Sequence, residues 1–71
     1  MKQRTSKPES FGARLRRLRT RAGLAGAELA RQCGVNRATV SRLEADDVGP
    51  SWQLVQRLAD VLGVSTEDLR G

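Results

Sequence analysis

The side chains best suited to binding chemistry in this 71-residue chain are two arginines five positions apart, Arg37 and Arg42. A guanidinium is a planar fork of N–H donors, so each arginine can donate two parallel hydrogen bonds to paired acceptors such as O6 and N7 of guanine. Ala38 and Ser41 share the same outward face if this segment is a helix. The segment therefore offers hydrogen-bond donors, with one apolar contact, to a partner rich in acceptors.

Most catalytic chemistry is excluded by residue type. The chain has no histidine and a single cysteine, Cys33. A His-based nucleophilic triad and an intrachain disulfide are therefore ruled out, and a zinc site lacks its usual ligands. No glycine-rich loop ends in Gly-Lys-Ser/Thr, which excludes P-loop chemistry. We expect no enzyme, no cofactor and no metal, and we expect Cys33 to pack as a small hydrophobe.

Positive charge is concentrated at one end of the chain. Residues 1–24 hold eight Lys and Arg against one Glu, residues 46–71 have a net charge of −3, and the whole chain carries +5. A basic end attracts a polyanion such as nucleic acid or an anionic membrane surface, although it is equally compatible with a merely solvated surface. No apolar run has the length of a membrane span or signal segment, so we expect a cytoplasmic protein with no membrane partner.

The length of the chain allows one small domain of modest stability. Residues 1–9 lack apolar periodicity and are predicted to form a flexible basic N-terminal arm that contains Lys2, Arg4 and Lys7. Such an arm either follows a groove or phosphate strand of a nucleic acid or makes no contact. Residues 10–71 are predicted to form the folded domain.

Apolar spacing predicts an all-α fold of five short helices. Ser10 caps a first helix that runs to about Ala22 and ends before Gly23. Arginines occupy most of its remaining surface. Its predicted inner face consists of Phe11, Leu15, Leu18 and Ala22.

Two further helices are predicted near the C-terminus. Ser51 caps a fourth helix that ends near Leu62, and a short fifth helix follows Ser65, which is predicted to form a capping box with Asp68. The predicted inner face of the fourth helix consists of Trp52, Val55, Leu58, Ala59 and Leu62. Trp52 is expected to anchor the core.

The second and third helices are predicted to form a helix-turn-helix over residues 26–45. The second helix runs from Gly26 to Cys33, and the third runs from Arg37 to about Ala45 after the N-cap Asn36. The residues expected to bring these two helices together are Leu29, Ala30, Cys33, Gly34, Val35, Val40 and Leu43. Ala30 is small enough for close approach, and Gly34 makes the tight turn without a Cβ clash.

The chain resembles the lambda-repressor-like, Cro-type helix-turn-helix proteins (the Xre family) over residues 11–69. The matching stretches are Phe11-Gly12, Ala22-Gly23-Leu24, Ala27-Glu28-Leu29-Ala30, Gly34-Val35, Thr39-Val40-Ser41-Arg42-Leu43-Glu44, Pro50-Ser51, Leu58-Ala59-Asp60 and Leu62-Gly63-Val64. The resemblance implies a compact five-helix domain that binds double-stranded DNA sequence-specifically as a transcriptional regulator, in the first instance a repressor.

The resemblance also implies roles for particular residues on and around the third helix. Base contacts are expected from Arg37, Ala38, Ser41 and Arg42, and phosphate contacts from Gly26, Asn36, Thr39 and Arg19. The same resemblance pairs Arg19 with Glu44, which would tie the first helix to the recognition helix. The alternative for Arg19 and Glu44 is two unrelated surface charges.

Two departures from the family pattern affect the expected affinity. Ala25 and Gly26 stand where the family usually has Ser or Asn followed by Gln, so a side-chain phosphate contact is missing. Asp46 and Asp47 follow the recognition helix, where negative charge repels phosphate. We therefore expect DNA binding that is weaker than is typical of the family and steeply dependent on salt. These departures also leave an alternative open, a protein-interaction or antitoxin-like module of the same fold.

A homodimer on a two-fold symmetric site is expected, with half-sites about one helical turn, ~34 Å, apart. Leu54 and Val61 lie seven residues apart on the fourth helix, away from its main inner face. Together with Val64 or Leu69 they could form the dimer patch, or they could be partly buried in the core.

Overall fold

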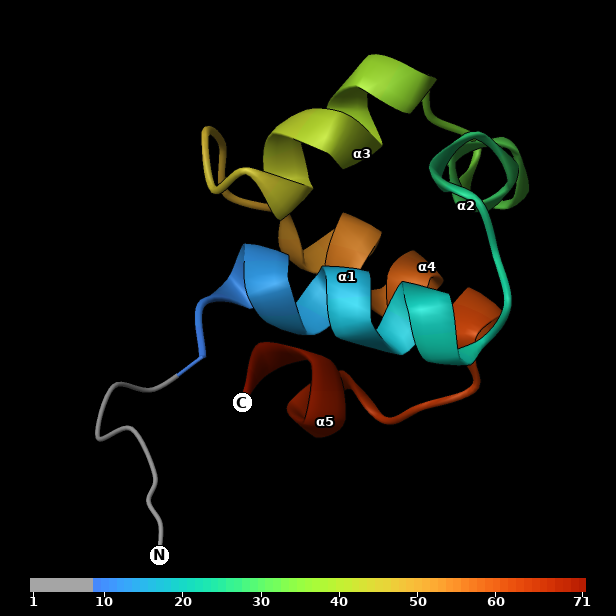
Figure 1. Cartoon of the computed structure of the whole chain (residues 1–71). Helices are drawn as coiled ribbons and strands as arrows, with labels where there is room; N and C mark the ends of the chain where they lie inside the picture. Colours follow the sequence, from blue (N-terminus) through green and yellow to red (C-terminus); the bar gives the residue numbers. More distant parts are fainter. Residues whose placement is uncertain (1–8) are drawn as a thin grey trace, which may run out of the picture.

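The computed structural model describes residues 9–71 of the chain, and this part contains five helices and no strand (Figure 1). In chain order the helices are α1 (Phe11–Arg21), α2 (Gly26–Cys33), α3 (Arg37–Glu44), α4 (Trp52–Leu62) and α5 (Thr66–Arg70). The prediction of an all-α, five-helix fold is confirmed. The arm predicted over residues 1–9 lies, apart from Glu9, outside the described residues.

Four of the five helices begin at a residue whose side-chain oxygen accepts a backbone N–H from three positions later. This bond satisfies one of the free amides at a helix start. The pairs are Ser10 with Ala13, Asn36 with Thr39, Ser51 with Leu54, and Ser65 with Asp68. The last pair is a full capping box. Helix α2 differs, because Ala25 stands at its cap and makes no side-chain bond.

The helices enclose one apolar core to which all five contribute. Helix α1 crosses the middle of the molecule, with α3 on one side, α5 on the other and α4 behind it, and α2 packs against α3 and α4 (Figure 1). The buried apolar side chains are Leu15, Leu18, Leu29, Ala30, Cys33, Val40, Leu43, Val55, Leu58, Ala59, Leu62 and Leu69. Because α3 lies at the edge of the bundle, only its inner face is covered.

Two helix ends differ slightly from the predictions. Helix α1 ends at Arg21, so Ala22 is its C-cap and is exposed instead of lying on the inner face. Helix α3 ends at Glu44, with Ala45 as its C-cap. The side chain of Ala22 is a single methyl group, so its burial would stabilise the fold only slightly. Apolar spacing alone therefore did not locate the end of α1 next to Gly23.

The structure corrects part of the predicted dimer patch. Leu69 is completely buried in the core, so it is not available to a partner. Leu54, Val61 and Val64 are half-buried and pack against the same core. Helix α5 lies under α1 and packs against α1 and α4 (Figure 1). Part of the surface of Leu54, Val61 and Val64 remains exposed, so their place in a dimer patch stays a prediction.

The backbones of α1 and α3 lie in close contact at Gly12. A Cβ atom at this position would lie 2.4 Å from the carbonyl oxygen of Glu44 and 2.6 Å from that of Leu43. Both distances are shorter than any real carbon–oxygen contact, and backbone atoms cannot move aside as a flexible side chain can. Gly12 is therefore required for the start of α1 to lie against the end of α3.

Candidate nucleic-acid interface

The turn between α2 and α3 brings the two helices together at small residues. Ala30 and Val40 are each only 2% exposed. Gly34 ends α2 with φ of +74°, a left-handed conformation that glycine adopts without strain. The Val35 N–H then donates to the Ala30 carbonyl at 3.0 Å, which closes the turn. Helix α3 is thus held by its inner face and projects its outer face from the molecule.

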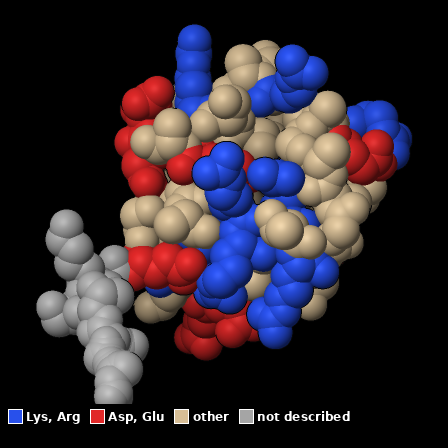
Figure 2. Space-filling view, viewed as in Figure 1, with Lys and Arg blue, Asp and Glu red and all other residues tan. Residues whose placement is uncertain are grey.

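The outer face of α3 carries the four residues for which base contacts are expected. Arg37, Ala38, Ser41 and Arg42 are all exposed. Figure 2, viewed as Figure 1, shows basic side chains standing at the edge formed by α3 and gathering over α1. No described element covers this face, so both guanidiniums can meet an external partner (Figure 1).

A shallow groove separates the start of α2 from α3. It is lined by Ala25, Gly26, Ala27, Arg37, Val40, Ser41 and Glu44. Gly26 is thereby placed beside Arg37 and Ser41, although these residues are eleven and fifteen positions later in the chain. The uncapped amides at the start of α2 and the outer face of α3 can therefore contact one strand of a polyanion together.

Asn36 and Thr39, for which phosphate contacts are expected, lie at the exposed start of α3. The Asn36 Oδ1 atom accepts hydrogen bonds from the Thr39 backbone N–H at 2.9 Å and from Thr39 Oγ1 at 3.1 Å. These bonds use the oxygen of the Asn36 side chain and leave its NH₂ group, which is the donor that a phosphate requires. Thr39 itself is half-buried, and its hydroxyl already donates within the cap.

Arg19 and Glu44 form a bidentate ion pair between α1 and α3. Arg19 Nε and Nη2 lie 2.6 and 3.1 Å from the two Glu44 carboxylate oxygens, and Nη1 donates to the Leu24 carbonyl at 2.9 Å. The two side chains are only 16% and 11% exposed. The hydrogen bond to Glu44 raises the pKa of Arg19. The Arg19 guanidinium therefore donates most of its hydrogen bonds to groups within the protein.

We predict that Glu44→Ala lowers the free energy of unfolding by about 1.5–3 kcal/mol, because it removes a partly buried, charge-assisted hydrogen-bond pair. Urea titration measures this change. Glu28→Ala is the matched control, since Glu28 pairs with Arg31 at the exposed surface of α2, where water screens such a pair and it contributes little to stability. Equal costs for the two substitutions would show that the Arg19–Glu44 tie adds nothing to stability.

Arg16 is the member of this network that sequence reasoning missed. Its Nε atom lies 3.7 Å from Glu44 Oε1, yet its side chain is 72% exposed. Arg16 precedes Arg19 by three residues, so the two share one side of α1. That spacing was the available signal. Because Arg19 is nearly enclosed, Arg16 is the better placed of the two to reach an external anion.

Two other arginines of α1 are occupied at its N-terminal end. Arg17 Nε and Nη2 lie 2.9 and 3.0 Å from the Glu9 carboxylate, and Arg14 donates to the carbonyls of Glu9 and Arg70, each at 3.1 Å. The bond to Arg17 lowers the pKa of Glu9. Glu9, the last residue of the predicted arm, therefore contacts α1, and its carboxylate offsets part of the positive charge of that helix.

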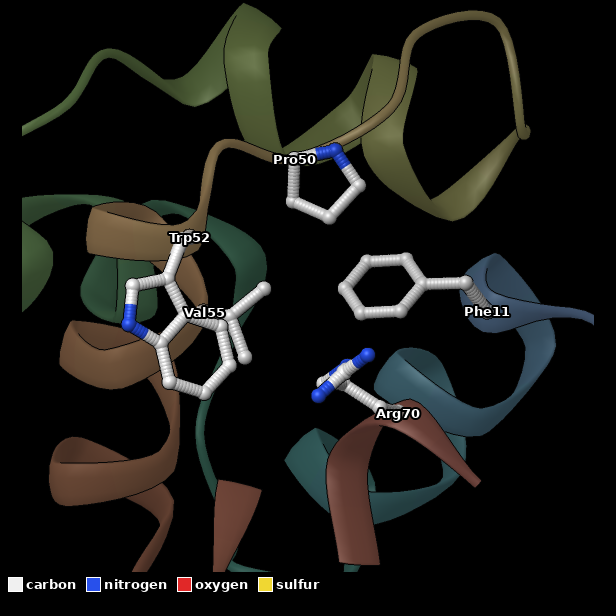
Figure 3. A pocket seen from close by; sticks show the side chains of 5 residues that line it. All are labelled: Phe11, Pro50, Trp52, Val55 and Arg70. Carbon is white, nitrogen blue, oxygen red and sulfur yellow. The ribbon is translucent and has the colours of Figure 1, made fainter. Parts of the chain in front are cut away.

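Trp52 lies outside the core, contrary to the prediction. It is 51% exposed and stands at the first position of α4. Its ring faces the Arg70 guanidinium, whose carbon lies 5.3 Å from the ring centroid, a cation–π distance. Figure 3 shows these two residues with Phe11, Pro50 and Val55 around an open hollow at the meeting point of α1, α4 and α5. Trp52 is exposed at the first turn of α4, so its apolar residue type did not ensure that it would be buried.

The remaining features of residues 9–71 concern metal ligands, membrane spans and the single cysteine. In this part of the chain there is no group of three or more His, Cys, Asp or Glu side chains that could hold a metal ion. None of the five helices is long and apolar enough to cross a membrane. Cys33 is buried, and this burial raises the pKa of its thiol, which disfavours the reactive thiolate.

Comparison with known proteins agrees with this geometry. The family model described as "Helix-turn-helix domain" matches residues 10–70. The chain is 38% identical over 56 residues to an uncharacterised HTH-type transcriptional regulator of Archaeoglobus fulgidus, a match that covers 79% of this chain and 80% of that protein.

Two solved structures show the same arrangement of helices. The restriction-modification controller protein C.AhdI of Aeromonas hydrophila superposes with a TM-score of 0.82 at 34% identity, covering 86% of this chain and 92% of that one. The P22 c2 repressor, solved in complex with a synthetic operator, has a TM-score of 0.83 at 24% identity and coverages of 89% and 96%. Because the sequence identity to the P22 repressor is low, this similarity is evidence for a shared fold alone. This chain therefore belongs to the helix-turn-helix domain family and has the lambda-repressor-like, Cro-type fold.

Proposed function

We propose that this protein is a sequence-specific transcriptional regulator that inserts α3 into the major groove of double-stranded DNA. The observation that carries the proposal is the exposed outer face of α3, where two arginines stand on a helix whose inner face is fully packed. The A. fulgidus relative is described as a transcriptional regulator and the A. hydrophila protein as a controller of restriction-modification, which supports this assignment. Such a regulator acts where the DNA lies, which in a prokaryotic cell is the cytoplasm.

Base reading is assigned to the four exposed residues of α3. Arg37, at the leading end of the helix, and Arg42 each donate two hydrogen bonds to O6 and N7 of a guanine. Ala38 offers only a methyl group, which suits the methyl group of thymine. Ser41 lies between the arginines and donates to either a base or a phosphate.

Phosphate contacts surround this face. The backbone amides at Gly26 point from the uncapped start of α2, where the helix dipole also favours an anion. The NH₂ group of Asn36 donates to a phosphate of the strand beside α3, and the Thr39 hydroxyl, which donates to Asn36 Oδ1, holds that amide in place. Arg19 contributes mainly as the tie to Glu44, and Arg16 supplies the exposed positive charge on the same side of α1.

We further propose that the protein binds as a homodimer, because two copies related by a two-fold axis read two half-sites. Among residues 9–71, Val48 and Trp52 are the large hydrophobic side chains that remain exposed. A dimer face that uses apolar contacts therefore includes this end of the molecule rather than the Leu69 region. Sedimentation velocity with and without DNA tests this: a monomer under both conditions would remove the dimer.

The direct test of the proposed function is selection of bound sequences from a random DNA duplex pool. We expect enrichment of one motif with guanines at the positions read by the arginines, and two copies of it about 10–10.5 base pairs apart, centre to centre. A pool that remains random after several rounds, with the protein folded, would overturn the proposal. Enrichment of a single half-site would support sequence-specific DNA binding and would overturn only the proposed homodimer.

The affinity for DNA should fall steeply with salt. The logarithm of the affinity is expected to decrease linearly with the logarithm of salt concentration, by about 0.9 for each phosphate neutralised. Arg16→Ala should make this slope shallower by about one for each bound copy. Arg57→Ala, which removes an exposed arginine of α4, should leave the slope unchanged. Affinity that stays flat between low and moderate salt would contradict phosphate binding by this surface.

The alternative of a protein-interaction or antitoxin-like module is not favoured. It depended on the missing Gln at the start of α2 and on the acidic pair Asp46 and Asp47. One of these acids, Asp46, is engaged within the fold, where its Oδ1 atom accepts the Gly12 N–H at 2.8 Å. The relatives are described as regulators, and no observation on the described residues identifies a protein partner instead.

A further inference from the structure

Asp46 ends the recognition helix in an unusual way. Its φ of +60° is the left-handed conformation, and among the described residues it is the non-glycine residue that adopts it. The Asp46 N–H donates to the Leu43 carbonyl and the Asp47 N–H to the Arg42 carbonyl, at 3.1 and 2.9 Å. This is the Schellman pattern of helix termination, in which glycine is the usual residue at the left-handed position. An aspartate tolerates this conformation better than most residues, but at some cost.

The Asp46 side chain makes a bond that glycine could not make. Its Oδ1 atom accepts the backbone N–H of Gly12, 34 residues earlier, at 2.8 Å. Ser10 caps the next amide of α1, that of Ala13. The start of α1 is therefore capped twice, once by its own Ser10 and once by the end of α3. A carboxylate at a helix start is also favoured by the helix dipole, and its hydrogen bond is charge-assisted.

The second tie between α1 and α3 lies two turns further along α1. Gly12 contacts Asp46, whereas Arg19 contacts Glu44. Seven residues of helix separate Gly12 from Arg19, about 10 Å along the helix axis. The packing of Val40 and Leu43 holds the inner face of α3, and the two ties add restraints between its C-terminal end and α1 that oppose a change in the α1–α3 angle. The absence of a Cβ at Gly12 is what permits the first tie to form.

We propose that Asp46 is a positioning residue that sets the angle of the recognition helix through Gly12. Helix α3 is anchored near its C-terminal end and has eight residues, about 12 Å in length. A pivot of about 10° at the anchored end would move Arg37 by about 2 Å, which exceeds the tolerance of about 0.5 Å for a specific contact. The inference rests on the proposed reading of DNA by α3. It assigns base discrimination to a residue that itself makes no base contact.

Asp47 provides a matched control for the charge of Asp46. It is the next residue and carries the same formal charge, and no hydrogen bond to its side chain occurs within residues 9–71. The experiment measures binding of Asp46→Gly, Asp46→Asn, Asp47→Gly and Asp47→Asn to two duplexes. One duplex is the selected site, and the other has the guanine read by Arg37 replaced. The ratio of the two affinities is the discrimination.

Both Asp47 variants should bind both duplexes about twofold more tightly, the effect of removing one negative charge about 10 Å from a phosphate in water. Their discrimination should be unchanged. Asp46→Gly removes the same charge and relieves the backbone, yet it should lower the discrimination about tenfold because Arg37 loses its alignment. Asp46→Asn keeps an acceptor oxygen and the left-handed tolerance, so it should restore most of the discrimination. If Asp46→Gly instead behaves like Asp47→Gly, the positioning role is overturned.

A second measurement needs no DNA and separates this inference from the proposed function. In nuclear magnetic resonance of the free protein, the Gly12 amide should exchange slowly with solvent, and Asp46→Gly should accelerate this exchange at least tenfold while Asp47→Gly does not. Residual dipolar couplings should show a change in the α1–α3 angle in Asp46→Gly alone. An unchanged angle would overturn the inference even if DNA binding is established. A wild-type protein that binds no sequence would overturn the proposed function, while the angle still decides whether Asp46 positions α3.

Discussion

Replacing Arg37 and Arg42 together with alanine should lower the affinity for the selected site about 100-fold or more. Each arginine is assigned two hydrogen bonds to one guanine, and a good bidentate pair contributes about 1–3 kcal/mol of discrimination. Both side chains are exposed on the outer face of α3, so their removal leaves the core intact. Fluorescence anisotropy with the selected duplex and with a scrambled duplex measures the loss. Affinity for the scrambled duplex should fall much less, because only phosphate attraction is reduced there.

The control for this double substitution is Arg31→Ala with Arg57→Ala. The control also removes two positive charges, but it removes them from α2 and α4 instead of from the outer face of α3. The control should weaken binding to both duplexes by a similar small factor and leave their ratio unchanged. Circular dichroism should show native helix content in both double variants. If the Arg37 and Arg42 variant retains the wild-type preference for the selected site, the assignment of α3 as the reading helix is wrong.

Gly12→Ala should destabilise the protein by about 2–3 kcal/mol. Alanine is normally the better helix residue by about 0.5–1 kcal/mol, but here its Cβ would lie 2.4 Å from the Glu44 carbonyl oxygen. Overpacking of a rigid contact costs about 1–3 kcal/mol or more. In a domain of this size that loss corresponds to a fall in Tm of roughly 10–20 °C. Thermal and urea unfolding measure both quantities.

Gly26→Ala is the matched control for Gly12→Ala. Gly26 is also in a helix, but no atom lies within 4 Å of a Cβ built on it. The substitution should therefore be neutral or stabilise the protein by up to about 1 kcal/mol. The two variants make the same chemical change with opposite expected signs. If Gly12→Ala is as stable as the wild type, α1 and α3 cannot lie as close together as the structure places them.

Much of the fold could be predicted because it depends on neighbours in the chain. Ser10, Asn36, Ser51 and Ser65 each cap a helix through an amide three residues away, so residue type and spacing were sufficient. Gly34 marks a turn for an equally local reason, its left-handed backbone. The repeat of Leu and Val along α1 and α4 identified the faces that pack. The all-α fold and its helix-turn-helix followed from these signals and from the family resemblance.

The corrections concern residues whose environment depends on distant parts of the chain. Trp52 and Leu69 are both apolar, yet Trp52 is exposed beside Arg70 while Leu69 is fully buried. Their burial depends on how α5 folds back on α1, which periodicity within one helix does not encode. Arg16 was counted as one of several surface arginines of α1. Only the position of Glu44 on α3 distinguishes it from them.

The residue sequence alone determined which segments are helical, where they start, and which arginines belong to the recognition helix, since each depends on contacts within about four residues. Tertiary structure alone decided which charged side chains bind a partner within the folded domain and which remain exposed. Asp46 and Asp47 are adjacent and of the same type, yet of the two it is the Asp46 carboxylate that accepts the Gly12 amide, because the end of α3 meets the start of α1. A charge is a property of one residue, whereas its partner is chosen by the packing of helices that are far apart in the chain.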